Sequence, residues 1–255
     1  MPKKISINRD ISIAKTLPSD FYLDKTFYEL SIERIFKKSW QLITHKKNLI
    51  NNIYPFTFLE GSVNEPLVIT LDNNNISCLS NVCTHRGNIL CDKSYLSKNI
   101  QCNYHGRLFK LDGKMKSMPG FNEVKNFPTD DDNLKSFDVM SWKDFIMVSL
   151  NTKIDLTEVF RDIDTRLAWY PFDELIYNKK DSNSYLIDAN WALYCENYVE
   201  GFHVPFVHKG LHGEIDYNSY NTVLLKNGTL QYTYSKSNKN ALKIPDSKKY
   251  IYAYY

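Results

Sequence analysis

This sequence contains no long apolar run. Stretches such as residues 145–150 are far too short to span a bilayer, which takes about 20 apolar residues. Lys3 and Lys4 open the chain in the manner of a signal peptide, but Arg9 and Asp10 interrupt the residues that follow, so no apolar core forms. We therefore expect a soluble, cytoplasmic protein that does not use a membrane as a partner.

A large charge of either sign is also absent. The formal net charge of +3 is small and spread along the chain, which argues against nucleic acid as a partner. Five cysteines is an odd number without regular spacing, which disfavours a secreted disulfide framework. Cys83 and Cys102 each have a histidine nearby, which favours metal binding. We expect Cys78, Cys91 and Cys195 to be small buried apolar residues.

Aromatic residues are plentiful, with 18 Tyr and 14 Phe, and this content argues against disorder. Apolar runs over residues 66–71 and 76–80, separated by the turn residues Asp72–Asn75, predict a pair of strands. Similar short runs continue as far as Phe145–Leu150. We therefore expect residues 40–150 to form an all-β domain of antiparallel strands, either a small sandwich or a barrel.

Helical patterns lie on both sides of this region. The sequence Thr26-Phe-Tyr-Glu29 is typical of a capping box and predicts a helix over about residues 27–38. Further helices are predicted over residues 156–169 and 191–203. We expect Pro205 to end the last of these helices, because proline cannot donate the next backbone hydrogen bond.

Strands return after about residue 221, with a hairpin turn predicted at Asn227-Gly228. The fold class is therefore α+β. We expect three parts: an N-terminal helical arm (residues 1–39), the all-β domain (40–150) and a partial α+β domain with an antiparallel sheet (151–255).

Two short motifs pair a cysteine with a histidine inside the all-β region. Cys83 and His85 form the first motif, C-x-H, and Cys102 and His105 form the second, C-x-x-H. Sixteen residues separate the motifs, so we expect them on two different loops. Two thiolates and two imidazoles suit a [2Fe–2S] cluster in which one iron takes both cysteines and the other takes both histidines.

A glycine follows each motif, at Gly87 and Gly106, where a loop must bend and offer backbone N–H groups to sulfur. A zinc site is one alternative, since a Cys₂His₂ set also binds zinc, although zinc motifs usually keep the two cysteines together and the two histidines together. A chance arrangement of four unrelated residues is a second alternative, which requires a coincidence at both loops.

A second candidate site lies in residues 190–208. Glu200 and His203 are three residues apart and would share one face of a helix. His208 could reach the same metal if the chain bends at Pro205. Two histidines and one carboxylate form the facial triad of non-heme Fe(II) oxygenases. The alternative is a pair of histidines near a helix end that are satisfied by hydrogen bonds.

These motifs resemble those of the alpha (oxygenase) subunits of Rieske non-heme iron oxygenases. Met118-Pro-Gly120 resembles the proline loop that covers the cluster in that family, and Phe36-Lys-Lys-Ser-Trp40 resembles the segment ahead of its Rieske domain. The resemblance covers most of the chain from about Tyr22. It implies that residues 40–150 are a Rieske domain and that residues 151–255 are part of the catalytic domain.

The resemblance also implies roles for the second site. His203 and His208 would bind mononuclear Fe(II), Asn197 would lie near that iron, and Glu200 would link the two metal centres. Many members carry aspartate at the position of Glu200, while a subset that acts on quaternary amines carries glutamate.

The implied activity is that of an oxygenase component. Electrons from NAD(P)H would reach the cluster through a separate reductase or ferredoxin, and the Fe(II) would activate O₂ to oxidise a small organic substrate, as a monooxygenase or a dioxygenase. Residues 203–220 look most like choline monooxygenase, so a quaternary ammonium substrate is the first expectation and aromatic ring hydroxylation the second. Relatives form homo-oligomers, usually trimers.

One ligand of the triad is missing from the matched motif. In the family it is a carboxylate further along the sequence, whereas the acidic residues after His208 are Glu214, Asp216 and Asp246. Residues 250–255 also read as a strand with an unpaired edge. We therefore expect a truncated second domain that binds iron weakly or not at all, unless Asp216 or water completes a natural short form.

Two rival interpretations remain. One is a Rieske electron carrier with an unrelated second domain, and the other is a catalytically inactive remnant. The remaining histidines match no motif: we expect His45 at a surface or strand edge, and His212 near the iron as an outer group.

Overall fold

The computed structural model describes residues 4–238 and 241–254, which fall into two compact units. The β unit comprises residues 29–154 and 172–180. The mixed unit comprises the described parts of residues 1–28, 155–171 and 181–255.

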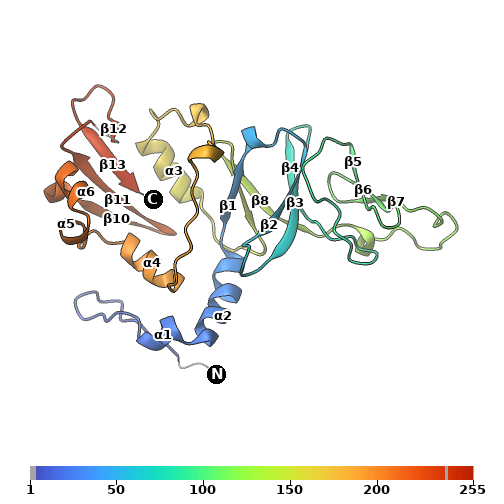
Figure 1. Cartoon of the computed structure of the whole chain (residues 1–255), viewed down its shortest axis with the longest axis horizontal. Coiled ribbons are helices and arrows are strands. Elements are labelled where there is room, and N and C mark those ends of the chain that lie inside the picture. Colours follow the sequence, from blue (N-terminus) through green and yellow to red (C-terminus); the bar gives the residue numbers. More distant parts are fainter. Residues whose placement is uncertain (1–3, 239–240, 255) are drawn as a thin grey trace. The chain divides into compact units, whose positions relative to one another are not determined.

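An antiparallel six-stranded sheet is the centre of the β unit (Figure 1). In spatial order its strands are β1 (Gln41–His45), β9 (Phe145–Ser149), β8 (Ser136–Trp142), β4 (Asn75–Ser80), β3 (Glu65–Asp72) and β2 (Ile53–Phe58). A two-residue turn joins β3 to β4, and its residues Asn73 and Asn74 have φ of 47° and 75°, which asparagine tolerates well. The strand pair predicted at residues 66–71 and 76–80 is therefore confirmed.

Both faces of β3 are buried, which explains its unbroken apolar sequence. Leu67 and Ile69 point into one core, which β9 also lines. Val68 points to the opposite face, into a second core that contains Cys83 and Cys102. The two predicted cysteine ligands are thus anchored to the sheet by apolar packing.

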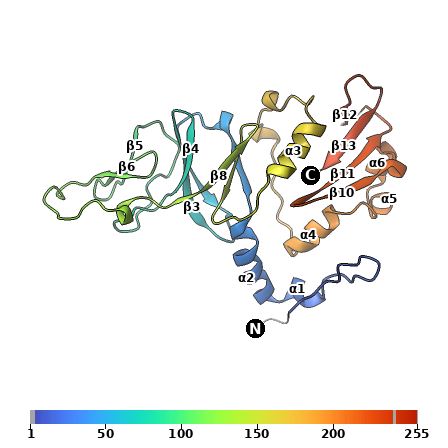
Figure 2. The ribbon, with the colours of Figure 1, turned by 180° about the vertical axis from the view of Figure 1, so that it is seen from behind.

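A small antiparallel sheet lies at the end of the β unit farthest from β1 (Figures 1 and 2). Its strands are β5 (Asn99–Gln101), β6 (Leu108–Lys110) and β7 (Met115–Ser117). The short 3₁₀ helices of this unit are η1 (Phe36–Lys38), η2 (Lys46–Asn48), η3 (Asp130–Asp132) and η4 (Phe172–Glu174). The expected all-β domain of antiparallel strands is confirmed.

The mixed unit holds a four-stranded antiparallel sheet with short helices around it. The spatial order of its strands is β10 (Asn221–Leu225), β11 (Gly228–Ser235), β13 (Tyr250–Tyr254) and β12 (Leu242–Lys243). The helices are α1 (Ser19–Leu23), α3 (Thr157–Arg166), α4 (Trp191–Tyr198), α5 (Val204–Val207), α6 (Lys209–Glu214) and the 3₁₀ helix η6 (Tyr217–Ser219). Two more helices cross unit boundaries: α2 (Lys25–Arg34) and η5 (Lys179–Asp181). The α+β fold class is confirmed.

The start of α2 differs from the prediction. Asp24 Oδ1 accepts the Thr26 N–H at 2.8 Å, so Asp24 caps the helix and Thr26 lies inside it. The capping box expected at Thr26 is therefore wrong. The helix also ends at Arg34, and a 3₁₀ turn follows it.

The role predicted for Pro205 is also wrong. The helix that starts at Trp191 ends at Tyr198, and Pro205 lies in the first turn of α5. A missing N–H does no harm there, because the first N–H groups of a helix have no partner within the helix.

Two predictions about this four-stranded sheet need correction. The β10–β11 turn is Lys226-Asn227 rather than Asn227-Gly228, because Gly228 already pairs with Leu225. The strand expected to have an unpaired edge is β13, which pairs with β11 on one side and with the short β12 on the other.

His45 lies on β1, an edge strand of the six-stranded sheet, so the strand-edge expectation is confirmed, although the residue is only 6% exposed and packs its ring edge-on against Phe145. Burial corrects one further expectation. Cys78 and Cys91 are buried as expected, but Cys195 is exposed on α4.

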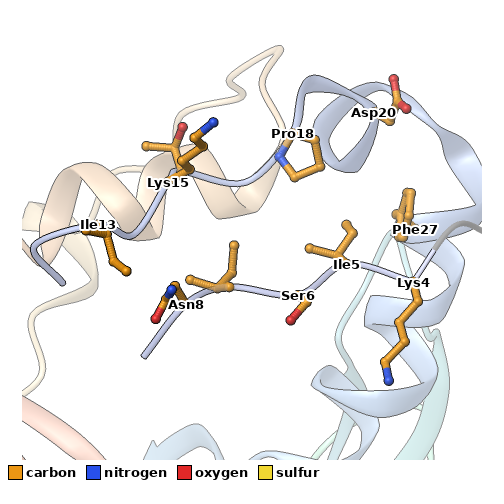
Figure 3. A pocket seen from close by; sticks show the side chains of 11 residues that line it. Lys4, Ile5, Ser6, Asn8, Ile13, Lys15, Pro18, Asp20 and Phe27 are labelled. Carbon is orange, nitrogen blue, oxygen red and sulfur yellow. The ribbon is translucent and has the colours of Figure 1, made fainter. Parts of the chain in front are cut away.

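N-terminal residues between 4 and 20, together with Phe27 of α2, surround a pocket of about 410 Å³ (Figure 3). Its lining combines apolar residues such as Ile5, Ile13 and Phe27 with polar ones that include Lys4 and Lys15. Within the described part of the chain, no helix combines the length and apolar character needed to cross a membrane.

Candidate metal centres

The two Cys/His motifs lie on loops with the same backbone geometry. In the first loop, Cys83 N–H donates to the Asn88 carbonyl at 2.8 Å, and Gly87 N–H donates back to the Cys83 carbonyl at 3.0 Å. In the second loop, Cys102 N–H donates to the Arg107 carbonyl at 2.8 Å, with the same return bond at 3.0 Å. Each loop is therefore closed by its own backbone.

The glycines are needed for the bend, but they do not point at sulfur. Gly87 and Gly106 have φ of 69° and 74°, a conformation that favours glycine. Their N–H groups bond to the cysteine carbonyls, so the expectation that they face sulfur is wrong. The Sγ of Cys102 instead accepts the backbone N–H groups of Tyr104 and His105.

The side chains of the two motifs converge. The rings of His85 and His105 have centroids 4.7 Å apart, and the Cys83 and Cys102 thiols hydrogen-bond to each other. Both cysteines are at most 3% exposed. Nδ1 of His85 is buried without a hydrogen-bond partner, as expected of a ring nitrogen that is kept for a metal.

The local environment affects the two thiols differently. Burial raises the pKa of the Cys83 thiol. Burial also acts on Cys102, but the N–H groups of Tyr104 and His105 outweigh it and hold the pKa of that thiol below its ordinary value. Desolvation and the charge of His105 lower the pKa of His85, which favours the neutral imidazole that binds metal.

This donor set fits a [2Fe–2S] cluster better than a single ion. Within the described residues, no three His, Cys, Asp or Glu side chains come together as a site for one metal ion. A [2Fe–2S] cluster needs only two protein ligands at each iron, because its sulfides supply the others. Two loops that each offer one sulfur and one nitrogen meet that need.

The predicted proline loop packs against the second of these loops. A Cβ on Gly106 would lie 3.1 Å from Cγ of Pro119, so the glycine also permits this close approach. Met118 is buried in the same core as the two cysteines, and Phe121 packs edge-on against His85 with centroids 6.4 Å apart.

The second pair of histidines flanks α5. His203 precedes the helix and His208 follows it, and their ring centroids are 5.0 Å apart. The sequence predicted that Glu200 and His203 would share one face of a helix. This prediction is wrong, because α4 ends at Tyr198. They meet in the turn between the helices, where the Glu200 carboxylate contacts His203 Nδ1 and accepts the Phe202 N–H.

The Glu200 contact orients the imidazole. Burial tends to raise the pKa of the Glu200 carboxyl, but the hydrogen bonds from His203 and from the Phe202 N–H lower it on balance. A carboxylate on Nδ1 holds the proton there and leaves Nε2 as the free lone pair, which is the usual arrangement behind a metal-binding histidine.

A cavity of about 420 Å³ opens beside this pair. His203, His208, Glu200 and Asn197 all line it. The aromatic members of its lining are Tyr194, Tyr198, Tyr220 and Tyr252.

The turn that carries Glu200 is held by the neighbouring sheet. Gln231, which is 3% exposed on β11, donates to the Tyr198 carbonyl at 2.6 Å and accepts the Tyr220 hydroxyl at 2.6 Å. A Cβ on Gly201 would lie 2.6 Å from the Tyr220 ring, so only glycine fits there. Sequence reasoning missed both Gln231 and Tyr220, since they lie outside the motif and far along the chain from it.

Two of the three acidic residues that follow His208 are engaged elsewhere. Glu214 Oε2 accepts the Tyr252 hydroxyl at 3.0 Å, and Asp216 Oδ1 accepts the Asn218 N–H at 3.2 Å as the cap of η6. His212 does not line the cavity.

A comparison with protein families finds a match over the region that carries the two Cys/His loops. The Rieske [2Fe–2S] domain matches residues 39–128, a range that contains all four predicted cluster ligands.

Curated relatives match over most of this chain. Chloroplastic choline monooxygenase of Beta vulgaris is 30% identical over 234 residues, which are 89% of this chain and 52% of that protein. The oxygenase subunit of carnitine monooxygenase from Acinetobacter pittii is 27% identical over 253 residues, which are 97% of this chain and 66% of that subunit. The chain thus spans between about half and two thirds of the length of these relatives.

Solved structures share the fold. A quaternary ammonium Rieske monooxygenase with a bound inhibitor has a TM-score of 0.72 at 24% identity, over 87% of this chain and 62% of that one. A naphthalene 1,2-dioxygenase has a TM-score of 0.61 at 20% identity, over 81% and 51% of the two chains. Residues 39–128 are a Rieske [2Fe–2S] domain, and over most of its length the chain is similar to choline monooxygenase and to the oxygenase subunit of carnitine monooxygenase.

Proposed function

We propose that this chain acts in the oxygenase component of a Rieske non-heme iron oxygenase. The observation that carries the proposal is a pair of histidines beside a cavity, in the same chain as the Rieske domain. His203 and His208 lie with ring centroids 5.0 Å apart beside a cavity of about 420 Å³. A Rieske electron carrier would have no use for this pair or this cavity.

The predicted ligands fall into two sets, one for the [2Fe–2S] cluster and one for the mononuclear iron. Cys83, His85, Cys102 and His105 would bind the [2Fe–2S] cluster, and His203 and His208 would bind a mononuclear Fe(II). When bound, the cluster supplies one-electron transfer and the iron supplies oxygen activation. The apolar core around Cys83 and Cys102 shields these two cysteines from water, whereas His105 is exposed. The tyrosine-lined cavity would receive the substrate.

Glu200 would connect the two functions as a positioning residue. Its carboxylate holds the proton of His203 on Nδ1 and keeps the imidazole in one orientation. Asn197 lines the same cavity and would contact substrate or water there.

Glu200→Gln is expected to slow the single-turnover reoxidation of the dithionite-reduced protein about 10–100-fold, with Fe(II) and O₂ supplied. Glutamine keeps the size of the side chain but loses the charge that holds the His203 proton. Glu196→Gln is the matched control, because Glu196 bonds to the Tyr22 hydroxyl at 2.8 Å and not to a histidine. Equal rates in Glu200→Gln and the wild type would exclude this role.

A quaternary ammonium compound is the substrate class that we propose. The names of the choline and carnitine relatives support it. The four tyrosines of the cavity lining also support it, because a cation that cannot donate hydrogen bonds is held well over aromatic faces. Phe202 and Phe206, which the sequence also offered for this role, are 79% and 80% exposed and do not line the cavity.

Choline and carnitine are expected to bind more tightly than benzoate in isothermal titration. Tyr198→Leu should weaken the binding of choline about fivefold, equivalent to about 1 kcal/mol, since one aromatic face is lost. Phe206→Leu is the control, because it removes an aromatic ring outside the cavity. Tighter binding of benzoate would favour aromatic ring hydroxylation, the second candidate, to which the fold shared with naphthalene 1,2-dioxygenase also points.

The electron source and the assembly also belong to the proposal. A separate reductase or ferredoxin, fed by NAD(P)H, would reduce the cluster. A quaternary ammonium Rieske monooxygenase of similar fold is described as transferring electrons between subunits, which supports a homo-oligomer, with a trimer as the expected form. A cytoplasmic location remains a prediction, since the plant relatives are named as chloroplastic.

A further inference from the structure

Asn88 and Arg107 occupy the same position in the two cluster loops. Each is the fifth residue after its cysteine, directly follows the glycine of its loop, and accepts the N–H of that cysteine at 2.8 Å. Neither belongs to the Cys/His motifs. Both side chains leave their own loop and contact the other one.

Arg107 joins its loop to the first loop. The side chain is only 4% exposed, and Nη1 donates to Thr84 Oγ1 at 2.7 Å. Thr84 lies between Cys83 and His85. A buried guanidinium contact therefore connects the loop that carries Cys102 to the centre of the first motif.

Asp132 completes this connection. Arg107 Nη2 donates to Asp132 Oδ1 at 3.1 Å, and the Thr84 hydroxyl donates to the Asp132 carbonyl at 2.8 Å. The other carboxylate oxygen accepts the Thr129 N–H at 2.8 Å, which contributes most to the lowered pKa of Asp132. The three residues form a closed triangle, and the Phe127 ring lies 5.5 Å from the guanidinium carbon.

Asn88 makes the contact in the opposite direction. Its Nδ2 donates to Cys102 Sγ at 3.8 Å and to the Ile89 carbonyl at 2.7 Å, which fixes the amide. A neutral N–H group aimed at a ligand sulfur stabilises negative charge on that sulfur.

We propose that Asn88 and Arg107 are paired positioning residues that fix the spacing of the two cluster loops. The Arg107–Thr84–Asp132 triangle holds the loops at the separation that the cluster requires and so retains the cluster. Asn88 raises the reduction potential through its N–H···S bond, because the reduced cluster carries one more negative charge. This inference rests on the proposed assignment of Cys83, His85, Cys102 and His105 as ligands.

The first test measures how long the cluster is retained. Arg107→Met keeps the apolar stem but removes the donors, and Asp132→Ala removes the acceptor. Both are expected to lose cluster absorbance to a chelator about 10–100-fold faster than the wild type. Asp131→Ala, at the exposed neighbouring carboxylate, should match the wild type. Circular dichroism at the same temperature separates loop opening from unfolding.

Thr84→Val provides a milder variant, because it removes only the hydroxyl bonds of the triangle and keeps the side-chain shape. It should release the cluster faster than the wild type even if Arg107→Met does not fold. Wild-type retention in Thr84→Val and Asp132→Ala would overturn the role of the triangle.

The second test measures the midpoint potential by titration followed by EPR. Asn88→Leu is expected to keep the cluster and shift the potential to a lower value, whereas Asn103→Leu, at an exposed position of the other loop, should leave it unchanged. An unshifted potential in Asn88→Leu would overturn the role of Asn88. A cluster that persists in Cys83→Ser would show that the ligand assignment is wrong. That outcome is distinct from an unshifted potential in Asn88→Leu, which would exclude only the role of Asn88.

Discussion

Cys83→Ser is expected to yield a protein without the [2Fe–2S] cluster and without the EPR signal that dithionite produces in the wild type. Cys83 is 3% exposed and its thiol contacts that of Cys102, so no other sulfur can replace it without moving the loop. A serine hydroxyl is a hard ligand that stays protonated near neutral pH, whereas an Fe–S cluster requires soft thiolates. His105→Ala should have the same result.

Cys91→Ser is the matched control for this experiment. Cys91 is 2% exposed in the same core, but its Sγ lies 3.4 Å from the Tyr95 hydroxyl and away from the predicted ligands. The variant should keep the cluster. The wild-type spectrum should show an average g below that of all-cysteine clusters, because histidines replace two thiolates. A colourless wild type that contains zinc and no sulfide would contradict the prediction.

The two Cys/His loops were predictable because the information that specifies them is local. Each motif places one sulfur and one nitrogen within four residues, and the following glycine permits the positive φ that the loop requires. The turn at Asn73 and Asn74 was predictable for the same reason. In these segments, short-range backbone geometry determines the loop conformation, and tertiary packing changes it little.

The sequence predicted that Glu200, His203 and His208 would lie close together, but it did not predict the backbone geometry that brings them together. The periodic pattern suggested one helix through His203, whereas the chain forms α4, a turn and α5. Proline is compatible both with the end of one helix and with the first turn of the next, and the sequence alone does not distinguish the two. Glu200 and His203 meet because the carboxylate accepts the Phe202 N–H in the turn.

Long-range contacts were beyond sequence reasoning. Gln231 reaches Tyr198 across 33 positions, and Arg107 reaches Asp132 across 25. Cys195 was misjudged for a related reason, since burial depends on which face of a strand or helix the tertiary fold covers. The equal spacing of Asn88 and Arg107 from their cysteines was visible in the sequence. That each side chain contacts the other loop could be seen only in the structure.

Iron at the second centre is expected to be weakly held in this chain. A facial triad needs a carboxylate beside its two histidines. Glu200 lies close, but its carboxylate already contacts His203 Nδ1 and the Phe202 N–H. Glu214 is bonded to Tyr252, and Asp216 caps η6. Across residues 4–238 and 241–254, no third His, Cys, Asp or Glu joins a pair to form a single-ion site.

After desalting, the purified chain should therefore contain about one iron for each acid-labile sulfide, the ratio of a [2Fe–2S] cluster alone. A chain that also kept the mononuclear iron would contain about three irons for every two sulfides. His203→Ala should leave the ratio unchanged, because little iron is held there. A third iron that survives desalting and is lost in Asp216→Ala, but not in the control Asp246→Ala, would contradict the prediction. It would show that Asp216 turns away from Asn218 to complete the triad when iron is present.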